Sequence, residues 1–207
     1  PFKDKEKIGI STKAFFKKHK ILPGSVVILL LPGSRQQEID KHIKVFIEVV
    51  KVMRKQISDI KFVLGKSSNI NLPVLPDYIS IEENSNIGFN HATAAIVSSG
   101  TVTLECALEN TPMIVCYKLS SISYFFARIL VKTRHISLVN LITGEEVVPE
   151  LIQSKMTSKN IMKLLPELLD TKSERRRRII DKYSKLKKLL GPPGAYTRAA
   201  ELIVNKT

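Results

Sequence analysis

A continuous apolar run, followed at once by a glycine turn and a helical pattern, restricts the fold of this chain to a few classes. Residues 26–31 read VVILLL. A run without polar alternation is typical of a strand in a parallel sheet, because such a strand is covered on both faces. After the turn at residues 32–35 (PGSR), apolar residues recur at helical spacing from Gln36 to Lys55. The sequence therefore predicts a buried strand, a turn and an amphipathic helix.

The same order recurs later in the chain. Residues 94–97 (AAIV) form a second buried-strand pattern, which Ser98, Ser99 and Gly100 interrupt, and a helix is expected over residues 101–109. Because the carboxyl ends of parallel strands lie at one edge of a sheet, we expect the two glycine turns to face one ligand site.

The residue types in these turns suit an anion that carries a sugar. Gly100 has no Cβ, so a ligand can approach the backbone there. Thr101 or Thr103 is expected to cap the helix and to leave its first N–H groups for an anion. Glu105 can accept two hydrogen bonds from a vicinal diol such as that of ribose, and Arg35 can bind phosphate oxygens in a bidentate manner. Each turn alone is also explained as a tight strand-to-helix connection, but the pair favours a nucleoside diphosphate site.

The remaining pattern alternates strands with helices. Further strands are expected at 61–64, 78–81 and 112–117, and helices at 13–20, 86–91, 157–169, 172–190 and 195–204. This alternation predicts an α/β fold, a Rossmann-like parallel sheet with helices on both faces and additional carboxyl-terminal helices.

Three segments after residue 120 are less regular. Residues 121–131 form a strongly apolar helical pattern that suits a core, a membrane surface or a partner domain. Residues 135–142 are expected to be short and extended. In residues 147–153, Pro149 suits the first turn of a helix.

Composition and charge set the broad class. With 207 residues and 43% hydrophobic residues, the chain can bury a sizeable core. We expect a linker or amino-terminal arm at 1–22, a ligand-binding domain at 23–170, and basic amphipathic and terminal helices at 171–207; the first residue, Pro1, suggests a piece of a longer protein. The net charge is +14, and residues 172–190 hold nine Lys or Arg against two acidic residues, a net +7. Such charge favours nucleic acid, acidic lipid or phosphorylated ligands.

No secretory signal or membrane span is evident, and metal chemistry is not indicated. The two cysteines, Cys106 and Cys116, suit buried thiols in a reducing compartment. The four histidines, at 19, 42, 91 and 135, form no close pair, and the sequence contains no DxD motif. We therefore expect no metal and no other cofactor, and we expect the histidines to be surface or packing residues.

Several segments together resemble one enzyme family. LLPGSRQQEI (30–39), VSSGTVTLECAL (97–108), PMIVCYK (112–118), LVKTRHISLVNLI (130–142) and VVPELIQ (147–153) occur in this order. The chain resembles the carboxyl-terminal half of lipid-A-disaccharide synthases, which are inverting glycosyltransferases of the GT-B class. One departure is Val139, where the family commonly has a proline.

The resemblance implies a reaction and a set of donor contacts. The family transfers 2,3-diacylglucosamine from its UDP derivative to 2,3-diacylglucosamine 1-phosphate, and the carboxyl-terminal half binds the UDP-sugar. By resemblance, the residues that contact the UDP-sugar are Gly33, Ser34, Arg35, Ser99, Gly100, Thr101, Glu105, Asn140, Glu150 and Gln153. Arg35 would stabilise the departing diphosphate in place of a metal.

The resemblance also implies partners and a location. The general base and the site for the acylated glucosamine 1-phosphate acceptor belong to the amino-terminal half, so we expect this chain alone to bind the donor and to catalyse little. Because both substrates are acylated, we expect a cytoplasmic protein at the inner face of the inner membrane. An anionic membrane surface would contact the Phe125 and Phe126 segment and the basic helix, and a homodimer partner could compete for that surface.

Two alternatives remain open. Another GT-B enzyme, such as a UDP-N-acetylglucosamine 2-epimerase, would share the nucleotide site. A nucleic-acid-binding module would use the basic helix at 172–190, but no recognised signature or aromatic platform accompanies that charge, so we expect no nucleic acid partner.

Overall fold

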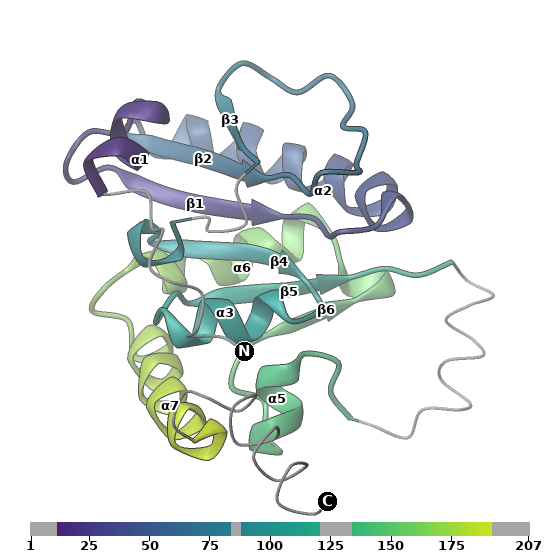
Figure 1. Ribbon diagram of the computed structural model, residues 1–207, viewed down its shortest axis with the longest axis vertical. Coiled ribbons are helices and arrows are strands. Elements are labelled where there is room, and N and C mark those ends of the chain that lie inside the picture. Colours follow the sequence, from purple (N-terminus) through teal and green to yellow (C-terminus); the bar gives the residue numbers. More distant parts are fainter. Residues whose placement is uncertain (1–11, 84–87, 121–133, 192–207) are drawn as a thin grey trace, which may run out of the picture.

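A parallel sheet forms the centre of the protein. The computed structural model describes residues 12–83, 88–120 and 134–191. In these residues six strands pair in parallel in the order β3-β2-β1-β4-β5-β6 (Figure 1). Their bounds are β1 Val26–Leu31, β2 Ile60–Gly65, β3 Ile79–Glu82, β4 Ala94–Ser98, β5 Met113–Tyr117 and β6 Glu150–Ile152. The predicted Rossmann-like α/β fold is confirmed.

Helices cover both faces of this sheet (Figure 1). Helices α2 (Gln36–Gln56) and α6 (Ser158–Leu169) pack together on one face. Helix α3 (Val102–Leu108) lies on the other, with α5 (Leu138–Thr143) and α7 (Glu174–Leu190) beside it. Helix α1 is Thr12–Lys18, and short 3-10 helices occur at Phe89–His91 and Gln153–Lys155. None of the helices in the described part of the chain is long and apolar enough to cross a membrane.

The continuous apolar runs form the core, as their sequence indicates. Ile28, Leu29 and Leu30 of β1 are fully buried, and Phe46 on the apolar face of α2 is buried with them. Burying one such side chain contributes about 1.5–3 kcal/mol. The core therefore fixes the carboxyl ends of β1 and β4, where the two glycine turns begin.

The strand order reverses next to β1. The chain passes from β1 through α2 to β2 on one side, and later returns to β4 on the other side of β1. In open α/β sheets a ligand crevice forms outside the carboxyl ends of the strands at such a reversal. The fold thus places the turn after β1 and the turn after β4 side by side.

Two expectations for the segments after residue 133 are wrong. The segment 135–142 is not extended, because Ser137 caps α5 by accepting a hydrogen bond from the Asn140 N–H at 3.3 Å and Gly144, with φ 71°, ends the helix. The segment 147–153 does not begin a regular helix at Pro149. Instead Glu150–Ile152 forms the edge strand β6, and the Pro149 carbonyl accepts from the Val115 N–H at 2.9 Å. Proline is tolerated at the start of an edge strand.

The other helical predictions fall into two groups. The helices expected at 13–20, 36–55, 101–109, 157–169 and 172–190 are present within two residues at each end. The helices expected at 121–131 and 195–204, with residues 86 and 87 of the one expected at 86–91, lie outside the described residues. The domain boundaries after residues 22 and 170 stay predictions, although Phe15 of α1 and Tyr183 of α7 are both buried in the same core.

Candidate functional site

A cavity of about 700 Å³ lies at the carboxyl ends of β1, β2, β4 and β5. It brings together six of the predicted site residues, three from the turn after β1 and three from the turn after β4, namely Gly33, Ser34, Arg35, Ser99, Gly100 and Thr101. Arg35 and Gly100 therefore face one space, as the two-turn prediction requires. The other polar side chains that line the cavity are Glu38, Lys66, Ser67, Ser68, Glu83, Ser98 and Tyr117.

The turn after β1 already contains a carboxylate. An Oε oxygen of Glu38 accepts hydrogen bonds from the backbone N–H groups of Ser34 (3.0 Å) and Arg35 (3.4 Å). Gly33 has φ 130°, and a Cβ at that position would lie 2.3 Å from the same oxygen. The glycine therefore leaves room for Glu38. Sequence reasoning missed this contact, because Glu38 stands where a capping box has its Glu but Arg35 stands where that motif has Ser or Thr.

Arg35 provides the positive charge of this turn. It occupies the N-cap position of α2 with an extended backbone (φ −115°, ψ 142°), and its side chain is exposed. Among residues that the structure describes, the guanidinium forms no ion pair. Burial raises the pKa of Tyr117, the charge of Glu38 raises it further, and the charge of Arg35 opposes both. Because the guanidinium has no ion-pair partner among the described residues, it is available to an anion in the cavity.

The turn after β4 is open beside its glycine. Gly100 has φ 157° and nothing within 4 Å of the position that a Cβ would occupy. The expected threonine cap is wrong: Thr101 has helical backbone angles and makes no side-chain capping bond. Thr103 donates its hydroxyl hydrogen to the Gly100 carbonyl at 2.8 Å instead. The Ser99 hydroxyl donates to the Ile136 carbonyl at 2.8 Å, which holds this turn against the segment before α5.

Glu105, Asn140, Glu150 and Gln153 do not line this cavity. Glu105 is half-buried on α3. Gln153 accepts a hydrogen bond from the Leu119 N–H at 3.2 Å. The assignment of these four residues to the UDP-sugar stays a prediction.

Asn140 and Glu150 form an internal network around α5. The Asn140 amide donates to the Val148 carbonyl and to Glu150, both at 2.9 Å, and its oxygen accepts from the N–H groups of Val147 (2.8 Å) and Val148 (3.0 Å). Glu150 also accepts from the Ser137 N–H at 2.9 Å. Because Asn140 is fully buried and all its hydrogen-bonding positions are used, its role in this structure is to hold the loop.

His42 connects the segments that follow β1 and β5, two of the strands whose ends line the cavity. Its Nδ1 bonds the Pro32 carbonyl at 2.7 Å, and its Nε2 accepts from the Lys118 N–H at 3.0 Å. These partners require a neutral ring with hydrogen on Nδ1. Burial lowers the His42 pKa and outweighs the hydrogen bond to Pro32, which raises it. The expected packing role therefore includes positioning the turn after β1.

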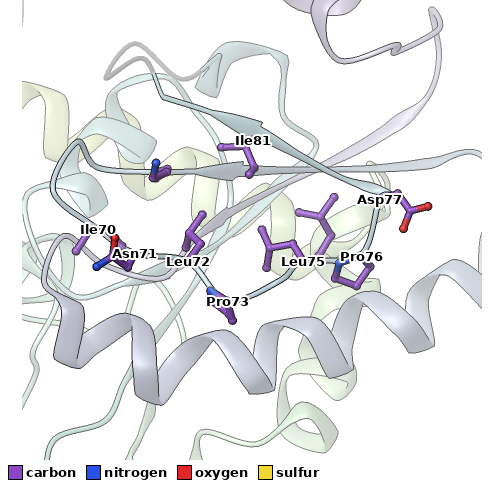
Figure 2. A pocket seen from close by; sticks show the side chains of 10 residues that line it. Ile70, Asn71, Leu72, Pro73, Leu75, Pro76, Asp77 and Ile81 are labelled. Carbon is purple, nitrogen blue, oxygen red and sulfur yellow. The ribbon is translucent and has the colours of Figure 1, made fainter.

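A second cavity, of about 410 Å³, lies under the loop before β3 (Figure 2). Ile70, Leu72 and Leu75 of the loop and Ile81 of β3 line it. Among the side chains that the structure describes, none of the predicted site residues lines this cavity. Lys66, Asn71 and Asp77 also contribute, but most of the lining is aliphatic or proline. The first cavity, which contains six predicted site residues, is therefore the candidate site.

No metal centre is found in the part of the chain that the structure describes. There, no group of three or more His, Cys, Asp or Glu side chains is placed to hold an ion. Cys106 and Cys116 are free and buried, and burial raises the pKa of both thiols. The expectation that no metal is used stays a prediction.

Comparisons with known proteins give the family signal. A family model described as lipid-A-disaccharide synthetase matches residues 1–203. The lipid-A-disaccharide synthase of Syntrophus aciditrophicus is 35% identical over 182 residues, which are 84% of this chain and 47% of the relative. That of Solibacter usitatus is 34% identical over 199 residues, 93% of this chain and 52% of the relative. The chain spans about half the length of the curated relatives it matches.

Solved structures share the fold at low identity. The S. aureus MnaA–UDP structure matches with a TM-score of 0.54 and 15% identity, over 82% of this chain and 42% of that one. E. coli ADP-heptose lps heptosyltransferase II matches with a TM-score of 0.52 and 12% identity, over 76% and 50%. WaaG, a glycosyltransferase of lipopolysaccharide biosynthesis, matches with a TM-score of 0.50 and 14% identity, over 95% and 51%. These similarities show the fold, and this chain covers 42% to 51% of each of the three structures.

Proposed function

The chain belongs to the lipid-A-disaccharide synthase family of glycosyltransferases, and from this premise we propose that it binds a UDP-sugar donor in the cavity between its two glycine turns. The observation that supports the proposal most is that Arg35 and Gly100, far apart in sequence, line one cavity of about 700 Å³. The cavity lies where α/β sheets bind ligands, outside the carboxyl ends of strands at a reversal of strand order.

The proposed reaction is the transfer of 2,3-diacylglucosamine from its UDP derivative to 2,3-diacylglucosamine 1-phosphate, with inversion at the sugar. In this proposal the present chain holds the donor. The general base and the acceptor site lie in the remainder of the protein, and the curated relatives are about twice as long as this chain.

Charge stabilisation on the leaving group is the step assigned to this chain. Cleavage of the sugar–phosphate bond leaves negative charge on UDP, and donors oriented in advance lower the cost of forming that charge. Glu38 already occupies the N–H groups of Ser34 and Arg35. The charged donor that this turn offers is the Arg35 guanidinium, which can bind two phosphate oxygens.

Titration of UDP into the protein by calorimetry tests this proposal. The wild type should bind UDP, and Arg35→Ala should weaken binding by about tenfold or more, since a hydrogen bond to a charged group contributes about 1.5–3 kcal/mol. Arg177→Ala is the matched control, because Arg177 is an exposed cation on α7 that does not line the cavity. Equal UDP affinities in wild type and Arg35→Ala would contradict the role of Arg35.

We also propose that the protein works at the inner face of the inner membrane and that α7 contacts anionic lipid. Arg177, Arg178, Lys185 and Lys188 are exposed on this helix. A homodimer partner is the competing occupant of the same surface.

A further inference from the structure

The hydroxyl of Ser98 is an exception among the buried polar side chains. Its side chain is 2% exposed, and its oxygen has no hydrogen-bond partner among the residues that the structure describes. The neighbouring hydroxyls are bonded, that of Ser99 to Ile136 and that of Thr103 to Gly100. A buried hydroxyl without a partner destabilises the fold, so its presence requires an explanation.

Ser98 lies at the point where the strands of the candidate site end. It is the last residue of β4 and it lines the cavity of about 700 Å³. In the sheet it is level with Cys116 of β5, and its neighbour Val97 is level with Leu31, the last residue of β1. Ser98 is therefore beside the start of the turn that contains Arg35.

Four charged side chains line the cavity together with Ser98, namely the cations Arg35 and Lys66 and the carboxylates Glu38 and Glu83. The Lys66 ammonium bonds Glu83 at 3.2 Å, and Glu38 accepts from backbone N–H groups of its own turn. Arg35 is the cation of the cavity for which no ion pair is found among the described residues. A guanidinium and a hydroxyl at the carboxyl ends of adjacent strands can bind one phosphate group from two sides.

We propose that the Ser98 hydroxyl donates a hydrogen bond to a phosphate oxygen of the nucleoside diphosphate in this cavity. The inference rests on the proposed function, because it takes the UDP part of the donor as the ligand. It adds a phosphate contact at Ser98, which lies in the segment 97–108 but is not among the site residues predicted from the sequence. The hydroxyl is satisfied only in the complex, so it lowers the stability of the free protein and raises the affinity for UDP.

This assignment predicts opposite effects of one substitution on folding and on binding. Ser98→Ala removes the unpartnered oxygen, so the unfolding midpoint of the free protein should rise by about 2–4 °C. The same variant should bind UDP about tenfold more weakly. A hydroxyl with a purely structural role would lower the unfolding midpoint when it is removed and leave the affinity unchanged.

Thermal unfolding without ligand and calorimetric titration with UDP measure both effects. Thr111→Val is the matched control, because the Thr111 hydroxyl is also buried (1% exposed), donates to the Phe89 carbonyl at 2.6 Å and does not line the cavity. This control should lose stability and keep the UDP affinity of the wild type. The ³¹P chemical shifts of bound UDP should differ between the wild type and Ser98→Ala, since the contact is to phosphate.

The outcomes separate this inference from the proposed function. If the wild type binds UDP and Ser98→Ala binds it equally well, the Ser98 contact is overturned and the proposed function is not. A lower unfolding midpoint in Ser98→Ala, or unchanged ³¹P shifts, also overturns the contact. If the wild type does not bind UDP, the proposed function and this inference both fail.

Discussion

The His42 side chain connects the sheet to a turn of the candidate site. Its ring bonds the Pro32 carbonyl after β1 and the Lys118 N–H after β5. Lys118 is 76 residues from His42 in the sequence. Both bonds exist together only in the neutral ring, because protonation of Nε2 removes the acceptor that the Lys118 N–H needs. The turn after β1 therefore depends on the protonation state of this histidine.

The stability of the protein should fall as the pH is lowered through the range in which His42 titrates. Burial lowers its pKa in the folded state below the ordinary value of 6.5. Between these two pKa values the unfolded chain binds more protons than the folded one. The His42 contribution is thus complete above pH 6.5 and decreases as the pH falls towards the folded-state pKa. Urea unfolding between neutral and mildly acidic pH measures this decrease.

His42→Gln serves as the reference in this experiment, since glutamine offers a donor and an acceptor but does not titrate. Its free energy of unfolding should be lower at neutral pH, because the ring packs beside Phe46 and Tyr117, but it should depend less on pH. The same pH dependence in both proteins would show that another group is responsible.

Among the elements, α7 combines a packing face and a charged face. Ile179, Tyr183 and Leu186 are buried on one side. Some cations of the helix are used inside the protein: the Arg176 guanidinium donates to the Thr93 carbonyl at 2.7 Å and to the Leu168 carbonyl, and Lys182 bonds Glu145. The charge available to a partner is therefore smaller than the net charge of the segment.

Binding to anionic vesicles should depend on the exposed part of α7. Wild-type protein should co-sediment with vesicles that contain phosphatidylglycerol and not with pure phosphatidylcholine vesicles, and added salt should weaken the binding. Replacing Arg177, Arg178 and Lys185 by Gln should weaken it about a hundredfold, since each basic residue near the surface contributes about 1 kcal/mol.

A variant with the same loss of charge elsewhere controls for net charge. Lys44, Lys51 and Lys55 are exposed on α2, and their replacement by Gln should have a smaller effect. Equal losses in the two triple variants would show that net charge alone determines binding. Binding that ignores lipid charge and salt would favour a partner subunit as the occupant of α7.

At the scale of the whole molecule, the strand order assembles the site. The turns after β1 and β4 are separated in sequence by β2 and β3, yet β1 and β4 are hydrogen-bonded neighbours. The cavity is lined by a guanidinium, an ammonium, two carboxylates, hydroxyls and backbone groups, and the described residues contain no metal cluster.

The proposed role of Arg35 predicts that UDP binding does not require a divalent ion. Calorimetric titrations in the presence of EDTA should give the same affinity as titrations without it, since the leaving diphosphate is proposed to be stabilised by Arg35. A large loss of affinity in EDTA, restored by added magnesium, would show a metal site that this proposal lacks.

The sequence by itself determined the strands β1 to β5, the longer helices and the two turns that meet. A parallel strand covered on both faces requires a continuous apolar run, and a helix on a sheet requires an apolar face with a period of 3.6 residues, so both leave local signals. Gly33 and Gly100 marked the two turns in the sequence. A Cβ at Gly33 would meet Glu38, and the position beside Gly100 is open to a ligand.

Only the tertiary structure decided the short elements and the partners of single side chains. Helix α5 has six residues and β6 has three, too few for a period to appear, and β6 forms because β5 lies beside it. The contacts of single side chains depend on distances between groups that the fold brings together. Examples are the hydrogen bonds of Glu38 within its turn, the full set of bonds of Asn140 and the missing partner of Ser98. Residue type states what a side chain can bind, but packing determines which partner is within reach.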